Sequence, residues 1–285
     1  MAREYQTIEA GGELRVLSCH ERTMPVGDPR CCSGIVGVGN APALIARKDW
    51  PKCIDLSVIT TEILDQDGLS LCHSFMGCGL MEDAVHLAGR KDEQFSAGFL
   101  AGKVTGGVNT GAGIDEVMEA LLKYGICLRS TVAQNDYHDR YSQAAIDEAI
   151  QHRLFDVWDC GHDDVFDGAV SNLIYENPVG IGSMAFGGGH AIRKKGYWIS
   201  VKYGCVYSFG DNSWGLDWTN WTPALLDDFA KYCPDVIASR VLRTKGAGMW
   251  VFKESQISNG LNSFGAFGVE SIIANKDDAV PTVAA

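Results

Sequence analysis

The sequence predicts an α+β fold of two lobes, and two observations support this. Helical periods dominate the chain before Pro178, whereas glycines divide the part after it into short apolar runs that are typical of strands. Of the 285 residues, 46% are hydrophobic and 21% are charged, which is the composition of a globular protein with its own core. With helices first and strands second, an active site can lie in the cleft between the lobes.

Residues 1–53 predict an N-terminal arm packed on the body. Prolines and glycines are scattered through MPVGDPRCCSGIVGVGNAPAL without a sustained helical period, so we expect short strands there. The part GVGNAPAL imitates a dinucleotide-binding fingerprint, but it lacks the third glycine and a following βαβ unit. A Rossmann fold is therefore not expected.

Three helices are expected in the first part of the body. Residues 72–89 run helix-like because apolar residues recur three to five positions apart. The clearest helix covers 114–124, with acidic residues in its first turn and Gly125 as its stop. A third helix is expected at about 142–154. The expected strands lie in VGIGSMAF, HAIRKKGYWISV and CVYSFGDNSW, and the polar tail NKDDAVPTVAA is expected to fray or to dock on a partner.

The charge balance excludes some partners. The chain has 24 Lys and Arg residues against 36 Asp and Glu residues, a net charge of −12 that repels nucleic acid and anionic membranes. It has no charge-free stretch of about eighteen apolar residues and no recognisable signal peptide, so we expect a soluble, cytoplasmic protein, or a virion-associated one if a virus encodes it. The ten cysteines form no Cys-x-x-Cys pair, and we expect most of them to be reduced core residues.

Three segments carry residues suited to nucleophilic catalysis by a thiol. Cys72 lies six residues after Gln66 at the start of an expected helix, where the helix dipole lowers the pKa of a thiol. His190 follows a glycine run, and Asn212 lies one strand further on. A thiolate needs an imidazole that later protonates the leaving group, and the imidazole needs a third group to orient it. The Gln66 amide and the Cys72 backbone N–H are suited to bind a developing oxyanion.

The order of these segments resembles the papain-like cysteine peptidases. The matching segments are Gln66, Cys72-His73-Ser74-Phe75, Gly189-His190-Ala191 and Asn212-Ser213-Trp214-Gly215. The resemblance is strongest over 54–220 and implies a catalytic domain over 54–285. Within this domain it implies a helical lobe over about 54–155 with the nucleophile helix and a β-barrel-type lobe over about 156–270.

The resemblance also implies an activity. Peptide or protein substrates would be hydrolysed between the lobes by a triad of Cys72, His190 and Asn212, with Gln66 in the oxyanion hole. No metal and no organic cofactor is implied. A protein partner could bind through the N-terminal arm or the C-terminal tail.

The loop GGVNTG resembles the clamp of this family on the substrate backbone. Asn109, Thr110 and Gly111 therefore inherit a substrate-binding role. Trp214 is expected beside them, packed over the hydrogen bond between the catalytic histidine and asparagine.

The chain departs from the family at several positions. His73 stands where Trp is usual, and a role for it as a second base is not favoured because neighbours on a helix point in different directions. The two positions of a family disulfide hold Leu69 and Val108, in agreement with a reducing compartment. No counterpart of the long helical inhibitory propeptide precedes Trp50, so activation by removal of such a segment is not expected.

Two other functions remain open. The departures also suit a structural or binding component of a larger assembly, for example a viral one, that keeps the fold with weak or lost catalysis. The same residues perform acyl transfer, so a transamidase is the second alternative. Zinc bound by Cys19-His20 with Cys31-Cys32 is disfavoured because adjacent residues seldom point at one metal and the spacing fits no common zinc finger. The segment Cys160-Gly161-His162-Asp163-Asp164 is expected to be a solvated loop rather than a cation site.

Overall fold

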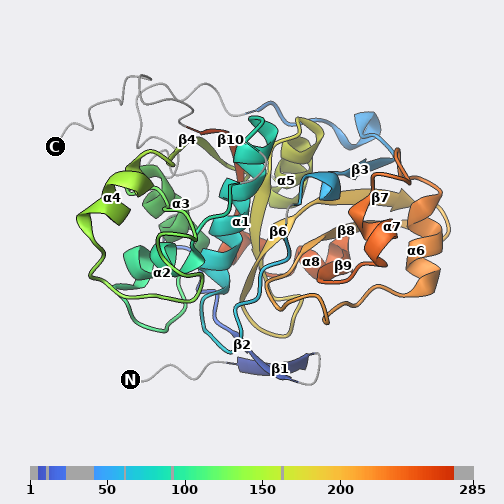
Figure 1. Cartoon of the computed structure of the whole chain (residues 1–285). Coiled ribbons are helices and arrows are strands. Elements are labelled where there is room, and N and C mark those ends of the chain that lie inside the picture. Colours follow the sequence, from blue (N-terminus) through green and yellow to red (C-terminus); the bar gives the residue numbers. More distant parts are fainter. Residues whose placement is uncertain are drawn as a thin grey trace.

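The computed structural model describes residues 6–10, 13–23, 42–60, 62–90, 93–161 and 164–272 (Figure 1). The expected C-terminal tail and the pair Cys31-Cys32 lie outside these residues. The longer helices are α1 (Cys72–Leu87), α2 (Ala97–Thr105), α3 (Ile114–Lys123), α4 (Gln143–Ile150), α5 (Val165–Ile174) and α6 (Pro223–Ala230). Short helical segments are η2 (Arg47–Asp49), η3 (Ser57–Ile59), α7 (Arg240–Thr244), α8 (Glu254–Ile257) and α9 (Leu261–Phe264). The strands are β1 (Gln6–Ala10), β2 (Glu13–Leu17), β3 (Cys53–Asp55), β4 (Leu154–Asp159), β5 (Val179–Ser183), β6 (His190–Lys194), β7 (Gly196–Ser200), β8 (Cys205–Asp211), β9 (Met249–Lys253) and β10 (Ala266–Ile272).

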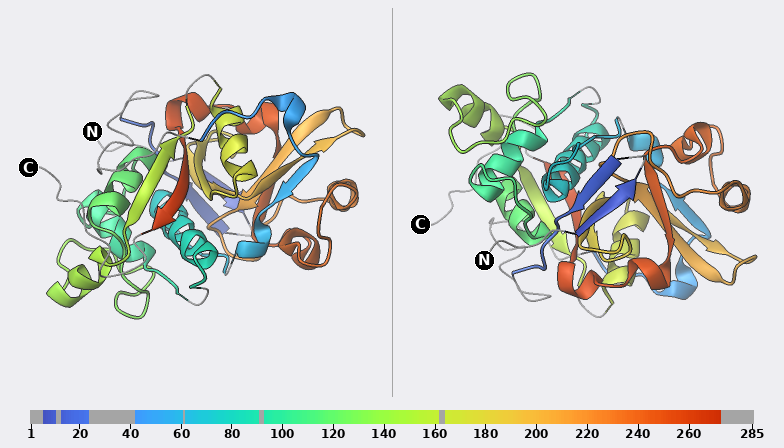
Figure 2. Two further views of the ribbon diagram at one scale, coloured as in Figure 1. Left: turned by 90° about the horizontal axis from the view of Figure 1, so that it is seen from above. Right: turned by 90° about the horizontal axis from the view of Figure 1, so that it is seen from below.

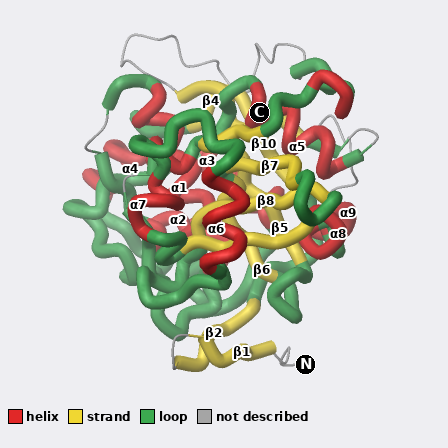
Figure 3. The backbone as a smooth tube through the Cα atoms, turned by 90° about the vertical axis from the view of Figure 1, so that its right-hand side faces the viewer, coloured by secondary structure: helices red, strands yellow, loops and turns green. Residues whose placement is uncertain are grey.

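The strands form two antiparallel sheets and a separate hairpin. One sheet has the order β4-β10-β5-β6 and the other the order β3-β7-β8-β9. Strands β1 and β2 pair with each other, from Gln6 opposite Leu17 to Ala10 opposite Glu13. Figure 3 shows this hairpin lying apart from both sheets, and the view from below in Figure 2 shows it across the middle of the molecule. The expected mixture of helices and strands is therefore confirmed. The arm contains strands β1 and β2, whereas most of the segment MPVGDPRCCSGIVGVGNAPAL lies outside the described residues.

Helix α1 is the central helix of the helical side, and nearly all of it is buried. It packs against α2 and α3 and also against β6 and β10. Glycines allow these close approaches, since a Cβ atom added at Gly77 would lie 2.5 Å from a methyl group of Val117. The expected helix at 72–89 is confirmed, and its first residue is the candidate nucleophile.

Two other expected helices differ in accuracy. Helix α3 matches its prediction and is followed by Gly125, whose φ of 70° lies in the left-handed region that glycine adopts readily. Helix α4 ends at Ile150 rather than near residue 154, because Leu154 begins strand β4 and Leu154 pairs with Ile272 of β10. None of the helices in the described part of the chain is long and apolar enough to cross a membrane.

Aromatic residues pack around the sheet β3-β7-β8-β9, whose strand β8 ends directly before Asn212. Trp198 stacks on Tyr207 and on Trp221, with ring centroids 4.7 and 5.5 Å apart. Phe209 and Phe229 meet edge to face at 5.1 Å. Such packing fixes β8, whose end leads directly into the candidate triad residue Asn212.

A buried ionic cluster joins α1 to the strand side. Arg193 of β6 lies 3.3 Å from Asp83 of α1 and 3.0 Å from Asp211 of β8. The Lys195 ammonium lies 2.5 Å from Asp83 and 3.6 Å from Asp211. The Thr60 hydroxyl donates to Asp211 at 2.9 Å. The cluster therefore connects the helix that begins at Cys72 with β6, which begins at His190, and with β8, which ends just before Asn212.

Candidate active site

The candidate nucleophile, Cys72, is the first residue of α1 and is fully buried. The free N–H groups and the dipole at a helix start favour the thiolate form of a cysteine. Burial raises the pKa of the Cys72 thiol, but the charge of His190 and its hydrogen bond to the thiolate, with a further contribution from His73, outweigh it and hold the pKa well below its usual value. By contrast, burial raises the pKa of the Cys19 and Cys78 thiols.

The imidazole of His190 is oriented by Asn212. His190 Nε2 lies 2.8 Å from Asn212 Oδ1, which also accepts the Ser213 N–H at 2.8 Å. Because that amide oxygen only accepts, Nε2 carries a proton and donates it. Nδ1 has no other hydrogen-bond partner in the described ranges, and it is the nitrogen left to serve the Cys72 thiolate.

Trp214 covers this pair as expected. Its ring stacks on the His190 ring at a centroid distance of 4.6 Å, and Phe186 meets His190 edge to face at 4.8 Å. Trp214 is itself 1% exposed, so it presents no open surface to a substrate here. The two rings exclude water from the hydrogen bond between His190 and Asn212.

Gln66 is brought to the same place by the segment after Asn212. Its backbone N–H donates to the Ser213 carbonyl at 2.9 Å, and its Oε1 accepts from the Ser213 hydroxyl at 2.5 Å. Its Nε2 donates to the Leu69 carbonyl at 2.7 Å. An amide nitrogen carries two protons, so one donor remains for an oxyanion.

The loop with Asn109, Thr110 and Gly111 also reaches the site. Asn109 Oδ1 accepts the Ser70 N–H at 2.8 Å, two residues before Cys72. The Thr110 N–H donates to the Val108 carbonyl. A Cβ atom added at Gly111 would lie 1.6 Å from the Ser18 carbonyl oxygen. Gly111 therefore lies against the main chain of residue 18, and its role in binding a substrate backbone stays a prediction.

That main chain belongs to the N-terminal arm, which covers the nucleophile. The Ser18 hydroxyl lies 3.6 Å from Cys72 Sγ. The Cys19 N–H donates to the Gly189 carbonyl at 2.9 Å, and the His20 N–H donates to the Ala112 carbonyl at 3.0 Å. The sequence analysis expected an arm packed on the body but did not predict that the arm lies over Cys72. The covering segment follows strand β2 and has no helical period, so the expectation that no long helical propeptide precedes Trp50 stays a prediction.

His73, which follows Cys72 on α1, is a residue whose effect on the site the sequence did not predict. It is fully buried, and neither ring nitrogen has a hydrogen-bond partner in the part of the chain that the structure describes. Although it is adjacent to Cys72 on the helix, it contributes to lowering the pKa of that thiol. His73 therefore adds to the effect of His190 on the pKa of the Cys72 thiol without a hydrogen bond of its own in the described residues.

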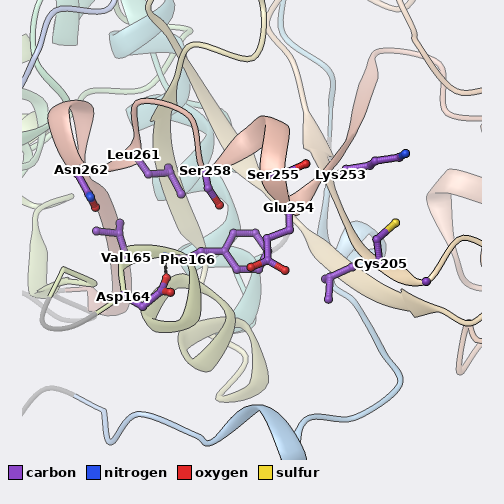
Figure 4. Close-up of a pocket in the computed structure, with 12 residues that line it drawn as sticks. Asp164, Val165, Phe166, Cys205, Lys253, Glu254, Ser255, Ser258, Leu261 and Asn262 are labelled. Carbon is purple, nitrogen blue, oxygen red and sulfur yellow. Dashed lines mark hydrogen bonds between the residues drawn. The ribbon is translucent and has the colours of Figure 1, made fainter.

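The rest of the described chain gives less evidence of a functional site. Among the described residues, no group of three or more His, Cys, Asp or Glu side chains is placed to hold a metal ion. The eight described cysteines are all free. A cavity of about 510 Å³ lies between the start of α5, the start of β8 and the segment α8–α9 (Figure 4), away from every predicted site residue. Over the candidate nucleophile lies the arm rather than this cavity.

The chain resembles known proteins in its fold rather than in its sequence. No protein-family model and no curated protein sequence matches the chain. Xylellain, a cysteine protease from Xylella fastidiosa, is 14% identical with a TM-score of 0.63, covering 91% of this chain and 98% of that one. Procathepsin L 3 of the Tenebrio molitor larval midgut is 16% identical with a TM-score of 0.57, covering 83% and 76%. The Carica candamarcensis cysteine protease CMS1MS2 is 16% identical with a TM-score of 0.54, covering 78% and 100%. At these identities the likeness concerns the fold, and the chain has the papain-like fold.

Proposed function

We propose that this chain is a papain-like cysteine hydrolase that cleaves peptide bonds. The observation that carries the proposal is the pairing of a buried thiol of lowered pKa, Cys72, with an imidazole whose other nitrogen is bound to Asn212 at 2.8 Å. A structural thiol has no need of this arrangement. The papain-like fold supports the same conclusion.

The mechanism follows from these contacts. The Cys72 thiolate attacks the carbonyl carbon of the substrate, and the charge moves to the carbonyl oxygen, where the Cys72 N–H and the free Gln66 N–H can bind it. When the C–N bond breaks, protonated His190 gives its Nδ1 proton to the leaving amine. His190 then takes a proton from water, whose oxygen attacks the thioester carbon. When the C–S bond breaks, the acid product is released and the Cys72 thiolate is restored. Asn212 keeps the ring in the required orientation throughout.

The arm has to move for this reaction to occur, because Cys72 is fully buried beneath it. This cover is also the observation that favours the alternative of a papain-fold structural protein with lost activity. Transamidation differs from hydrolysis only in the second step, in which an amine replaces water. The products of a turnover assay with added amines therefore separate these two reactions.

Thiol labelling of the full-length chain tests the proposal. An epoxide or vinyl-sulfone trap should modify Cys72 faster than any other cysteine, and His190→Ala should remove that preference because the thiol pKa rises. Peptide mapping by mass spectrometry reads each cysteine, and Cys205→Ala serves as the matched control on a half-buried thiol outside the site.

Turnover by site variants gives the second test. Cys72→Ala and His190→Ala should each abolish peptide cleavage, and their losses should not add. Gln66→Ala should lower kcat by about 10²–10³ with little change in KM, and Asn212→Ala should cost no more than that. If Gln66→Ala left kcat unchanged, Gln66 would not bind the oxyanion. If the thiol trap modified all cysteines at the same rate in every variant, the chain would be a structural protein without this catalysis.

A further inference from the structure

The segment that covers Cys72 is held through its main chain from two sides. Its bonds reach the Gly189 carbonyl, next to His190, and the Ala112 carbonyl, next to Gly111. Main-chain bonds of this kind hold a peptide whatever its side chains are. The side-chain contacts of the segment therefore indicate which chemical groups the surrounding surface selects.

On one side of Ser18, the surface binds a guanidinium. Arg15 Nη1 donates to Asp65 Oδ1 at 2.8 Å and to the Asp67 carbonyl at 3.0 Å. Arg15 Nη2 donates to the Trp214 carbonyl at 3.2 Å. Three acceptors around one planar cation match arginine better than the compact ammonium of lysine.

On the other side of Ser18, the surface binds a second guanidinium. Arg22 Nη2 donates to Asp159 Oδ2 at 2.6 Å, and Arg22 Nη1 donates to Asp159 Oδ1 at 3.3 Å. The guanidinium also lies over the Phe267 ring at 5.3 Å from its centroid. Both charged side chains are 4% exposed. This is a closely fitted, nearly dry site for arginine.

Both carboxylates belong to the body, so they stay when the arm moves away. When the arm leaves, water hydrates both carboxylates, and a ligand that brings a guanidinium to each can restore the charge-assisted hydrogen bonds that Arg15 and Arg22 made. The net charge of −12 adds a long-range attraction for cationic ligands. The cleft is therefore complementary to a basic peptide rather than to a neutral or acidic one.

We propose that the site selects peptides that carry arginine on both sides of the residue facing Cys72, at the places that Arg15 and Arg22 occupy. The inference rests on the peptide hydrolysis proposed above and gives its substrate class. The competing explanation is that Asp65 and Asp159 serve only to seat the arm, which needs little affinity because it is covalently attached.

Peptide binding to a full-length variant separates these explanations. Arg15→Ala and Arg22→Ala together loosen the arm, and Cys72→Ala prevents turnover. Two labelled peptides, unrelated to the arm elsewhere, carry either arginine or uncharged citrulline at the two positions. Fluorescence anisotropy should give a Kd at least tenfold lower for the arginine peptide. Adding Asp65→Asn, at a half-exposed position that tolerates the change, should reduce this ratio, as should Asp159→Asn, whereas Asp147→Asn on the exposed face of α4 should not.

Equal affinities for the two peptides would overturn the inference. So would an arginine preference that persists in both Asp65→Asn and Asp159→Asn. Restoring Cys72 separates the inference from the proposed function. Binding that prefers arginine without any hydrolysis overturns the peptidase and keeps the basic-peptide site, whereas hydrolysis with equal kcat/KM for both peptides does the reverse.

Discussion

Two groups of ion pairs lie beside the candidate catalytic residues, and they join different parts of the chain. The interior cluster of Arg193, Lys195, Asp83 and Asp211 joins α1 to β6 and β8, and all four side chains are at most 4% exposed. The arm pairs join residues 15–22 to the body, and one of their carboxylates, on Asp65, is 42% exposed. The first group connects elements of the core, whereas the second holds strand β2 of the separate hairpin and the segment that follows it.

This difference predicts which contacts can open. When an interior pair is broken, the remaining charge stays in the core, where water cannot reach it. When an arm pair is broken, both partners can be hydrated as the arm leaves, because β1 and β2 pair with each other and the described residues show no strand of the body paired with them. The frame of the catalytic residues should therefore be rigid beneath a cover that moves.

The largest effect is expected from Asp83→Asn. It leaves Arg193 and Lys195 with Asp211 as the only carboxylate of the cluster, and loss of one partner of a buried pair costs about 3–5 kcal/mol. The free energy of unfolding from urea titration measures this loss. The control Asp139→Asn, in an exposed pair with Arg140, should stay within about 0.5 kcal/mol of the wild type.

The comparison with the arm sharpens that experiment. Arg22→Ala also breaks a buried pair, but we expect a smaller loss than for Asp83→Asn because the arm can detach before the core unfolds. Equal losses for the two variants would show that the arm and the core unfold as one unit.

The sequence was sufficient for the candidate triad but not for its cover. Cys72, His190 and Asn212 stand in short, distinctive segments whose chain order carries the information. Ser18 contacts Cys72 through its hydroxyl, and Cys19 and His20 bind through their main-chain N–H groups. All three partners lie more than fifty positions away, and no local pattern encodes such a pairing. The alternation of charge and apolar residues in LRVLSCHER is equally typical of an ordinary edge strand.

Helix α2 was missed by the sequence analysis for a different reason. Helix α2 contains the run Phe99-Leu100-Ala101, and its first six residues are buried on every face, so it has no polar stripe to set a period. Helix α3, which is buried on one face only, was predicted almost to the residue. Between these two helices, a one-sided apolar pattern allowed the prediction of α3, and the lack of such a pattern hid α2.

A pH-dependent effect of intermediate size is expected at Glu82, which lies one residue before Asp83 on α1. Burial raises the pKa of Glu82 to about 7, although the Arg193 charge acts against this. The folded state thus binds the Glu82 proton more tightly than the unfolded state, whose pKa is about 4.5. The resulting stability is complete below pH 4.5 and is lost as the pH rises through about 7, to an extent of about 3 kcal/mol.

Glu82→Gln should remove this dependence, because glutamine keeps the shape of the neutral acid without a titrating proton. Unfolding titrations at several values between pH 5 and 8 measure the slope, with Glu119→Gln on the exposed face of α3 as the control. A slope that is the same in the wild type and in Glu82→Gln would assign the pH dependence to other groups.

The smallest effect in free energy, and the most selective one, is expected from Gly111→Ala. The three atoms nearest to the added Cβ would be the Ser18 carbonyl carbon and oxygen and the His20 Nε2, which all belong to the arm. The methyl group therefore displaces the arm and leaves the packing of the body as it is. Cys72 should be alkylated at least tenfold faster, which corresponds to a destabilisation of the closed arm by about 1.4 kcal/mol, and the free energy of unfolding should fall by no more than about that amount.

Gly68→Ala is the matched control for this variant. It lies four residues before Cys72, and an added Cβ there meets nothing within 4 Å, so the labelling rate should not change. If Gly111→Ala left the rate of Cys72 labelling at the wild-type value, the arm would already leave the site faster than the reagent reacts, and the cover would be no barrier. If Gly111→Ala instead lowered the unfolding free energy as much as Asp83→Asn does, the arm would be part of the core, and the distinction between a rigid frame and a moving cover would fail.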